Sequence, residues 1–78
     1  MDNQHKKVIL IEFGNTLRKI RLAKGFTQEQ LANELGVEIS QISRIERGVI
    51  NTSVTTIYEI SIALKINVSD LFEFNKIE

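Results

Sequence analysis

The sequence predicts an all-α fold, a compact bundle of five helices. Three observations predict it: proline is absent, strand-like alternation of polar and apolar residues is scarce, and apolar residues recur at three- and four-residue spacing. The 78 residues suffice for one small domain, 1–78, with a core expected at about residues 10–74. Hydrophobic residues make up 42% and charged residues 26%, which is typical of a folded domain and not of a disordered segment.

The first expected helix runs to about Lys24 and ends at Gly25, because glycine readily takes the left-handed conformation that closes helices. Its apolar stripe is formed by Leu10, Phe13, Leu17 and Ile20. We expect only the first half-dozen and the last few residues of the chain to be frayed.

The second expected helix begins after Thr27. Residues 27–30 have the Ser/Thr-x-x-Glu/Gln form of a capping box. In such a box the Thr27 side chain accepts from a backbone N–H, and the Gln30 side chain accepts in return from the backbone N–H of Thr27. The inward residues of this helix are then Leu31, Ala32 and Leu35. The third helix is expected over about residues 39–47, before Gly48.

The turn between the second and third helices makes strict demands on residue type. Gly36 stands where the turn needs a positive φ angle, and Ala32 stands where the two helices must cross closely, at about 90–120°. The positions that must face inward are all apolar: Leu31, Leu35, Val37, Ile42 and Ile45. This spacing predicts a helix-turn-helix over residues 28–47.

Two shorter helices are expected in the last third of the chain. The polar residues 51–53 can cap a fourth helix, which carries Ile57, Ile60 and Leu64 on one face. Asn67, three residues before Asp70, has the spacing of a cap for a short fifth helix. That helix would contain Val68, Leu71 and Phe72.

The charge is balanced overall but unevenly distributed. Residues 1–26 hold six basic and two acidic side chains, whereas residues 27–78 hold four basic and eight acidic ones. A net charge of zero argues against a protein that coats nucleic acid by bulk positive potential. The basic first third suits a polyanion that meets one side of the molecule, although solvated helix faces produce the same asymmetry.

The helix-turn-helix segment and its flanks resemble a known family. The motifs are LRKIR at 17–21, KGFTQEQLA at 24–32, LGV at 35–37 and ISRIERG at 42–48, followed by Ser53, Ile60, Ala63 and Leu64. In these motifs the chain is similar to the Cro and phage-repressor-like helix-turn-helix proteins, the XRE family. The resemblance implies a lambda-repressor-like domain that regulates transcription, as a homodimer on a palindromic operator. The third helix would lie in the major groove of double-stranded DNA and the second across the backbone.

The resemblance implies base contacts from the third helix. The residues at these positions are Glu38, Ile39, Ser40 and Arg44. Arg44 can donate two hydrogen bonds, to O6 and N7 of guanine, and Ile39 can pack on a thymine methyl group. Their alternatives are a phosphate contact for Arg44 and a partly buried position for Ile39. Glu38 departs from the family, which commonly carries a hydroxyl there; its carboxylate can accept from cytosine N4 but would face a phosphate-rich groove.

Backbone contacts and one ion pair are also implied by the resemblance. Gln28 would meet a phosphate at the start of the second helix, its alternative being an ordinary first-turn glutamine. The other backbone candidates are Arg18, Gln41, Ser43, Arg47, Asn51 and Thr52. Arg21 and Glu46 would form a structural ion pair between the first and third helices.

A dimer interface is expected in the C-terminal third, which has more apolar side chains than so short an ending can bury. The candidates are Ile62, Ile66, Phe72, Phe74 and Ile77. An exposed apolar patch usually marks an interface. Two alternatives remain: Ile66 and Phe72 can instead close the core, and a second candidate surface is formed by Val8, Ile9 and Ile11.

The sequence carries no signature of an enzyme, a cofactor site or a metal site. Cysteine is absent, His5 is the only histidine, and no glycine-rich phosphate-binding motif occurs. We therefore expect no catalytic residues, no cofactor and no bound metal, and no small-molecule effector. The longest apolar run, residues 8–11, is too short for a membrane span, so we expect no membrane contact and a cytoplasmic location.

Three alternative functions stay open beside that of a repressor. Two share the fold: a controller protein of a restriction-modification system, and an antitoxin that regulates its own operon. The third is a protein-interaction module that has lost DNA binding, which the zero net charge and Glu38 favour.

Overall fold

The structure, a computed structural model, describes residues 3–74 and is helical in all its regular elements. These are α1 (Asn3–Ala23), α2 (Gln28–Leu35), α3 (Ile39–Glu46), α4 (Val54–Leu64) and the 3-10 helix η1 (Val68–Phe72). The predicted all-α class is confirmed. The fifth helix differs from the expectation in kind, because five residues close through the tighter hydrogen bonds of a 3-10 helix.

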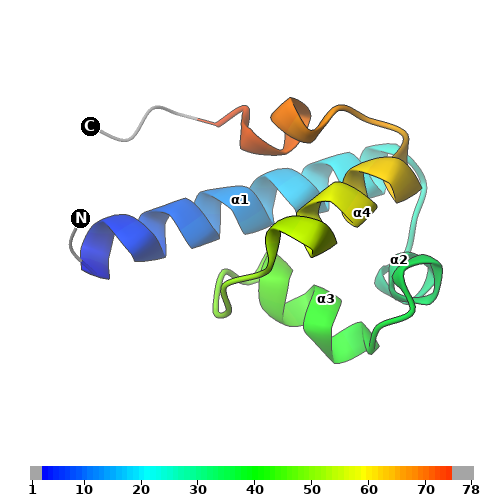
Figure 1. The fold of residues 1–78 in the computed structure, drawn as a ribbon, viewed down its shortest axis with the longest axis horizontal. Coiled ribbons are helices and arrows are strands. Elements are labelled where there is room, and N and C mark those ends of the chain that lie inside the picture. The colour runs from blue at the N-terminus through cyan, green and yellow to red at the C-terminus, as the bar shows by residue number, and fades with distance from the viewer. Residues whose placement is uncertain (1–2, 75–78) are drawn as a thin grey trace.

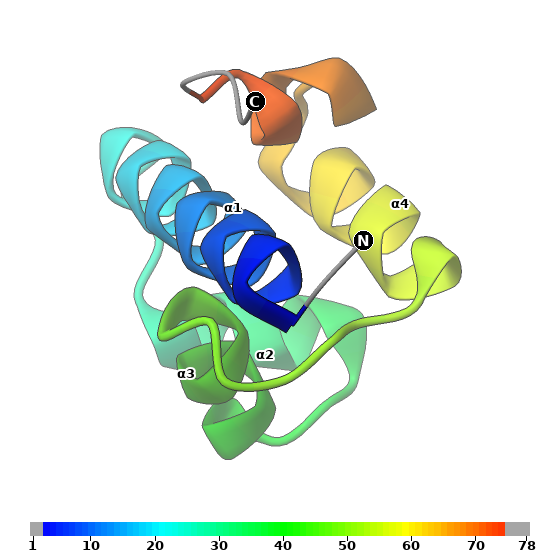
Figure 2. The ribbon, with the colours of Figure 1, turned by 90° about the vertical axis from the view of Figure 1, so that its left-hand side faces the viewer.

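The helices are arranged in three levels. In both views α1 and α4 lie at the middle, with α2 and α3 below them and η1 above (Figures 1 and 2). Within this arrangement α1 contacts α3 and η1, and α4 contacts α2 and η1. The helix-turn-helix pair is therefore on the side of the molecule opposite η1.

The core receives side chains from all five elements. Its buried members are Phe13, Leu17, Leu31, Ala32, Ile42, Ile45, Ile60, Leu64 and Leu71. Leu10 and Ile20 of the predicted α1 stripe are half-buried, and Ile20 packs against this cluster. The apolar positions inferred from helical spacing thus describe the core well. Among residues 3–74, no helix combines the length and apolar character that crossing a bilayer requires.

The helix ends agree closely with the expected caps. Thr27 Oγ1 accepts from Gln30 N at 3.0 Å, and Gln30 Oε1 accepts from Thr27 N at 2.9 Å, which completes the capping box of α2. Ser53 Oγ accepts from Thr56 N at 3.1 Å and caps α4. At η1, the N–H of Asn67 donates to Asp70 Oδ2 at 3.0 Å.

The first helix is longer than expected at its beginning. It starts at Asn3, within the half-dozen residues for which fraying was expected, and ends at Ala23, one residue before the expected position. The N–H of Phe26 donates to Arg21 O at 3.0 Å across the turn that contains Gly25. This turn ends α1 and leads to Thr27, the N-cap of α2.

Candidate nucleic-acid interface

The turn between α2 and α3 has the predicted glycine geometry. Gly36 has φ 68° and ψ 32°, a left-handed conformation that a Cβ atom would strain. The N–H of Val37 donates to Ala32 O at 3.0 Å, and Ala32 is buried against the core. The turn therefore fixes α3 closely against α2.

The outer face of α3 carries all four residues expected to contact bases. Glu38, Ile39, Ser40 and Arg44 are exposed, and the Glu38 side chain makes no capping hydrogen bond to α3. The opposite face is buried through Ile42, Ile45 and Glu46. A helix with one buried and one open side can enter a groove without losing its contacts to the core.

Gln28 stands at the first position of α2, but its side chain already has a partner. Its Nε2 donates to Glu46 Oε1 at 3.0 Å, and the residue is half-buried. The amide retains a second N–H, because Nε2 carries two protons. The Gln28–Glu46 contact was not expected from the sequence; the only available signal was the polar character of both residues.

Five of the remaining backbone candidates lie on α3 or follow its end. Gln41 and Ser43 are half-buried on it, while Arg47, Asn51 and Thr52 follow its end, the first two exposed and the third half-buried. All five belong to α3 or to the segment between α3 and α4. They therefore occupy one continuous stretch of chain beside the exposed face of α3.

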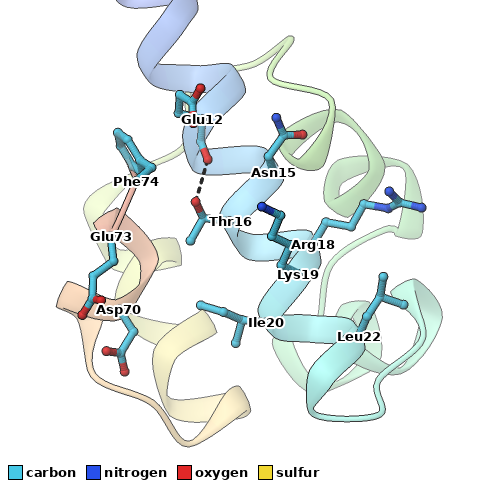
Figure 3. A pocket seen from close by; sticks show the side chains of 10 residues that line it. All are labelled: Glu12, Asn15, Thr16, Arg18, Lys19, Ile20, Leu22, Asp70, Glu73 and Phe74. Atoms are coloured by element: carbon cyan, nitrogen blue, oxygen red, sulfur yellow. Dashed lines mark hydrogen bonds between the residues drawn. The ribbon is translucent and has the colours of Figure 1, made fainter. Parts of the chain in front are cut away.

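Arg18 lies on α1 at the edge of a groove that runs between this helix and η1. Figure 3 shows its side chain pointing away from the acidic pair Asp70 and Glu73, which lie on the η1 side of the groove. Arg18 is four residues after Gly14, the point at which α1 touches α3, and so shares that face of the helix. This placement puts Arg18 on the same side of α1 as α3.

Three arginines near α3 are without an intramolecular partner in the described part of the chain. Across residues 3–74, Arg18, Arg44 and Arg47 make no ion pair and no side-chain hydrogen bond. All three are exposed. Their charges are thus available to an external anion.

Arg21 and Glu46 are brought together in the interior, as the resemblance implied. Arg21 Nε and Nη2 donate to the two carboxylate oxygens of Glu46, the second at 3.0 Å, and Nη1 donates to Phe26 O at 2.8 Å. Both residues are 5% exposed. Among residues 3–74, no buried side-chain nitrogen or oxygen lacks a hydrogen-bond partner, so this charge pair is fully satisfied.

Gly14 provides a close contact between α1 and α3 that sequence reasoning missed. A Cβ atom built on it would lie 2.4 Å from Glu46 O and 2.5 Å from Ile45 O. These are backbone atoms, which cannot swing aside as a flexible side chain can. The position of α3 relative to α1 therefore depends on the absence of a side chain at Gly14.

The five residues expected at a dimer interface fall into three groups. Ile62 is 59% and Phe72 44% exposed. Ile66 and Phe74 are half-buried against the core, and Ile77 lies outside the described residues. Phe72 packs on Phe13 with ring centroids 5.1 Å apart.

Two further apolar features adjoin these residues. Val54 and Tyr58, 81% and 60% exposed, precede Ile62 at four-residue spacing and form one stripe with it on α4. A hollow of about 80 Å³ is lined by Phe72 together with Ile9, Leu10, Ile50 and Ile57, among others. The hollow joins one of the two candidate surfaces, through Ile9, to Phe72 of the other.

The described residues contain no arrangement typical of a metal site. In the segment 3–74, no group of three His, Cys, Asp or Glu side chains is placed to hold an ion.

Comparison with known proteins identifies the family. A helix-turn-helix family model matches residues 17–71. The control protein C.BamHI of Bacillus amyloliquefaciens is 43% identical over 70 residues, which cover 88% of this chain and 86% of that protein. The restriction-modification controller protein C.AhdI of Aeromonas hydrophila has a TM-score of 0.78 and 41% identity, covering 81% of this chain and 96% of that one.

A third similar structure is that of the controller protein C.Esp1396I, crystallised as a tetramer with its natural 35-base-pair operator. It has a TM-score of 0.74 and 34% identity, and the match covers 83% of this chain and 86% of that one. The chain therefore belongs to the XRE-type helix-turn-helix family of DNA-binding transcriptional regulators.

Proposed function

We propose that this chain binds an operator in double-stranded DNA with α3 in the major groove and α2 across the backbone. The observation that carries the proposal is the exposed polar face of α3, with Arg44 unpaired among the described residues, on a helix whose other side is anchored by buried contacts. A surface arginine that reads a guanine edge needs a helix held at a fixed angle. The buried Glu46 and the close approach at Gly14 supply that anchorage.

The proposed contacts divide into those that read bases and those that hold phosphates. Glu38, Ile39, Ser40 and Arg44 would read base edges, with Arg44 as the main source of discrimination. The phosphate contacts would come from Gln28, Arg18, Gln41, Ser43, Arg47, Asn51 and Thr52. Arg18 and Arg47 add charge, which makes this part of the binding dependent on salt concentration.

We further propose that the protein acts as a homodimer on a palindromic site. One helix-turn-helix reads one half-site, and a twofold dimer places two recognition helices about one turn of DNA apart. The exposed stripe on α4 and the exposed ring of Phe72 offer apolar area for such an interface. The organisation as a single domain, 1–78, is part of this proposal, as is action as a binding protein without enzymatic activity.

Among regulators of this kind, we propose the controller protein of a restriction-modification system. The similarity to C.BamHI and C.AhdI supports it, because each match covers more than four fifths of both chains. A controller of this kind would act on the promoters of its own operon, in the cytoplasm. The repressor and antitoxin alternatives share the DNA-binding face and differ in the genes beside them.

The experiment that tests DNA binding is selection of bound sites from random DNA, followed by gel shifts with the selected and scrambled duplexes. We expect a palindromic site and its recovery upstream of the protein's own gene. Arg44→Ala should remove the preference for the selected site, about 1–3 kcal/mol, while non-specific binding remains. Gln28→Ala should weaken all duplexes alike.

Three outcomes would contradict parts of the proposal. Equal loss of both duplexes in Arg44→Ala would make Arg44 a phosphate contact. A changed base preference in Gln28→Ala would contradict the assignment of α2 to the backbone. Absence of any retarded band at low salt and micromolar protein would leave the protein-interaction module as the function.

A further inference from the structure

The carboxylate of Glu46 joins three helices through its hydrogen bonds. It accepts two from Arg21 on α1 and one, at 3.0 Å, from Gln28 Nε2 on α2, while Glu46 is itself the last residue of α3. The Arg21 bonds explain the burial of the charge. They do not explain the bond to Gln28, whose side chain is half-buried at the surface where a phosphate contact is proposed.

We propose that Glu46 is a positioning residue for the phosphate contact of Gln28; this inference rests on the proposed DNA-binding function. A glutamine amide can be turned over, which exchanges its acceptor oxygen with its donor nitrogen. A carboxylate only accepts hydrogen bonds, so Glu46 selects the orientation in which Nε2 faces it. One Nε2 proton is then bound to Glu46 and the second is left for a phosphate oxygen.

The arrangement gives a donor of fixed direction without a net charge. A lone carboxylate beside a phosphate would repel it, but the guanidinium of Arg21 neutralises Glu46. Because Glu46 ends α3, the amide of Gln28 is oriented by the helix that reads the bases. The phosphate contact of Gln28 and the base contacts of α3 therefore keep a fixed position relative to each other.

The positioning role and simple electrostatics predict effects of opposite sign for Glu46→Gln. If Glu46 acts only through its charge, removal of a negative group near phosphates should raise DNA affinity. If Glu46 orients Gln28, the glutamine at position 46 keeps its oxygen toward Arg21 Nε and places its amide nitrogen where Oε1 accepted from both Gln28 Nε2 and Arg21 Nη2. The amide of Gln28 then turns over and its donor moves, which should lower affinity.

The test measures binding of the selected and a scrambled duplex at fixed salt by wild type, Glu46→Gln, Gln28→Ala and the double variant. We expect Glu46→Gln to weaken both duplexes roughly three- to tenfold, the effect of about one hydrogen bond. In the Gln28→Ala background it should cause no further loss. Glu34→Gln is the matched control, because it removes the same charge from an exposed residue of α2 that does not bond Gln28 and is not among the proposed DNA contacts; it should leave affinity unchanged or raise it.

Unchanged or tighter binding by Glu46→Gln would overturn the inference, as would an equal loss with and without Gln28. Failure of wild type to bind any duplex would instead overturn the proposed function. These results are distinguishable, since the first two require a wild-type complex.

A measurement on wild type keeps the inference testable if Glu46→Gln does not fold. Gln28 and Gln30 lie on the same helix, but Gln28 uses its amide nitrogen in a hydrogen bond and Gln30 uses its amide oxygen. We expect the side-chain NH₂ protons of Gln28 to exchange with solvent several-fold more slowly than those of Gln30, as measured by NMR. Equal rates would overturn the inference.

Discussion

The helices α3 and α4 each bury one side and leave the other open, but the open sides differ in kind. That of α3 is largely polar and ends in the unpaired Arg44. That of α4 carries an apolar stripe of Val54, Tyr58 and Ile62. The open side of α3 can make directional contacts to an anion or to base edges. The apolar stripe of α4 contributes favourable free energy only when it is covered.

The two helices are also held in place by different forces. Arg21 holds the end of α3 through hydrogen bonds to the carboxylate of Glu46. Gly14 allows α1 to pack closely against the last carbonyl groups of α3. In contrast, α4 is anchored mainly by burial of Ile60 and Leu64, which is non-directional. A helix that reads atoms needs a fixed angle, while a helix that covers apolar area tolerates small rotations.

The largest effect is expected from Arg21→Ala, which leaves the carboxylate of Glu46 buried without its charge partner. Breaking a buried pair in this way costs about 3–5 kcal/mol. A domain of this size has a free energy of unfolding of roughly 4–12 kcal/mol, so the loss should be visible by urea denaturation. Arg18→Ala, an exposed arginine on the same helix, is the control and should change stability by less than about 0.5 kcal/mol. Similar losses in both variants would contradict a special role for the buried pair.

The next effect concerns the apolar stripe of α4. Tyr58→Glu with Ile62→Glu places two charges on it without touching the core, since both side chains are exposed. We expect dimer dissociation to be favoured by at least about a hundredfold, or about 2.7 kcal/mol, in sedimentation equilibrium. Phe74 is unsuitable for this test because it packs against the core.

The control for the α4 stripe is the double variant Val8→Glu with Ile11→Glu on α1, where the second candidate surface lies. If only the α1 variant becomes monomeric, the interface is at the N-terminal surface. A wild-type monomer at tens of micromolar would contradict the dimer itself.

A third effect is expected from Gly14→Ala. Alanine favours a helix interior by about 1 kcal/mol over glycine, but its Cβ would overlap the carbonyl oxygens of Ile45 and Glu46. Overpacking of this kind costs typically about 1–3 kcal/mol. We expect a net loss of thermal stability and, because α3 must shift, a loss of preference for the selected operator. Asn15→Ala, at the exposed neighbouring position, should leave operator preference unchanged and raise thermal stability slightly, because alanine favours a helix interior; a Gly14→Ala protein that is more stable and fully specific would show that α1 and α3 are not in close contact.

The fold followed from the sequence because its main signals are local. The capping box at Thr27 and the turn at Gly36 are defined by residues within a few positions of each other, and the core follows from helical spacing. The contacts that hold the C-terminal end of α3 join residues 18 or more positions apart in the chain. The bond from Gln28 to Glu46 could not be predicted, because helical spacing says which side of a helix is apolar and not which polar atoms meet across two helices.

The close contact at Gly14 and the exposed stripe of α4 each had a signal in the sequence, but helical spacing alone did not identify them. Gly14 is a glycine in the interior of an apolar-periodic helix, where it is unfavourable, and this misfit was the signal of a close approach. Val54, Tyr58 and Ile62 have helical spacing too, but so does the buried side of α4, so spacing alone could not decide which stripe is exposed. The 3-10 form of η1 depends on hydrogen-bond geometry over only five residues.

The smallest effects should come from the two N-caps. Ser53 caps α4 through its hydroxyl, whereas Glu38 at the same position of α3 makes no side-chain cap. Ser53→Ala should therefore destabilise the protein by about 1 kcal/mol. Glu38→Ser should stabilise it by less than that, because the new hydroxyl bond replaces a carboxylate that already interacts favourably with the helix dipole. Thermal denaturation of both variants measures the two changes, and a destabilised Glu38→Ser protein would mean that the carboxylate contributes more to α3 than the missing cap bond suggests.

If Glu38 reads cytosine N4, the stabilised Glu38→Ser protein should at the same time lose preference at one base pair of the selected site. The uncapped start of α3 would then be a loss of stability that is retained for recognition.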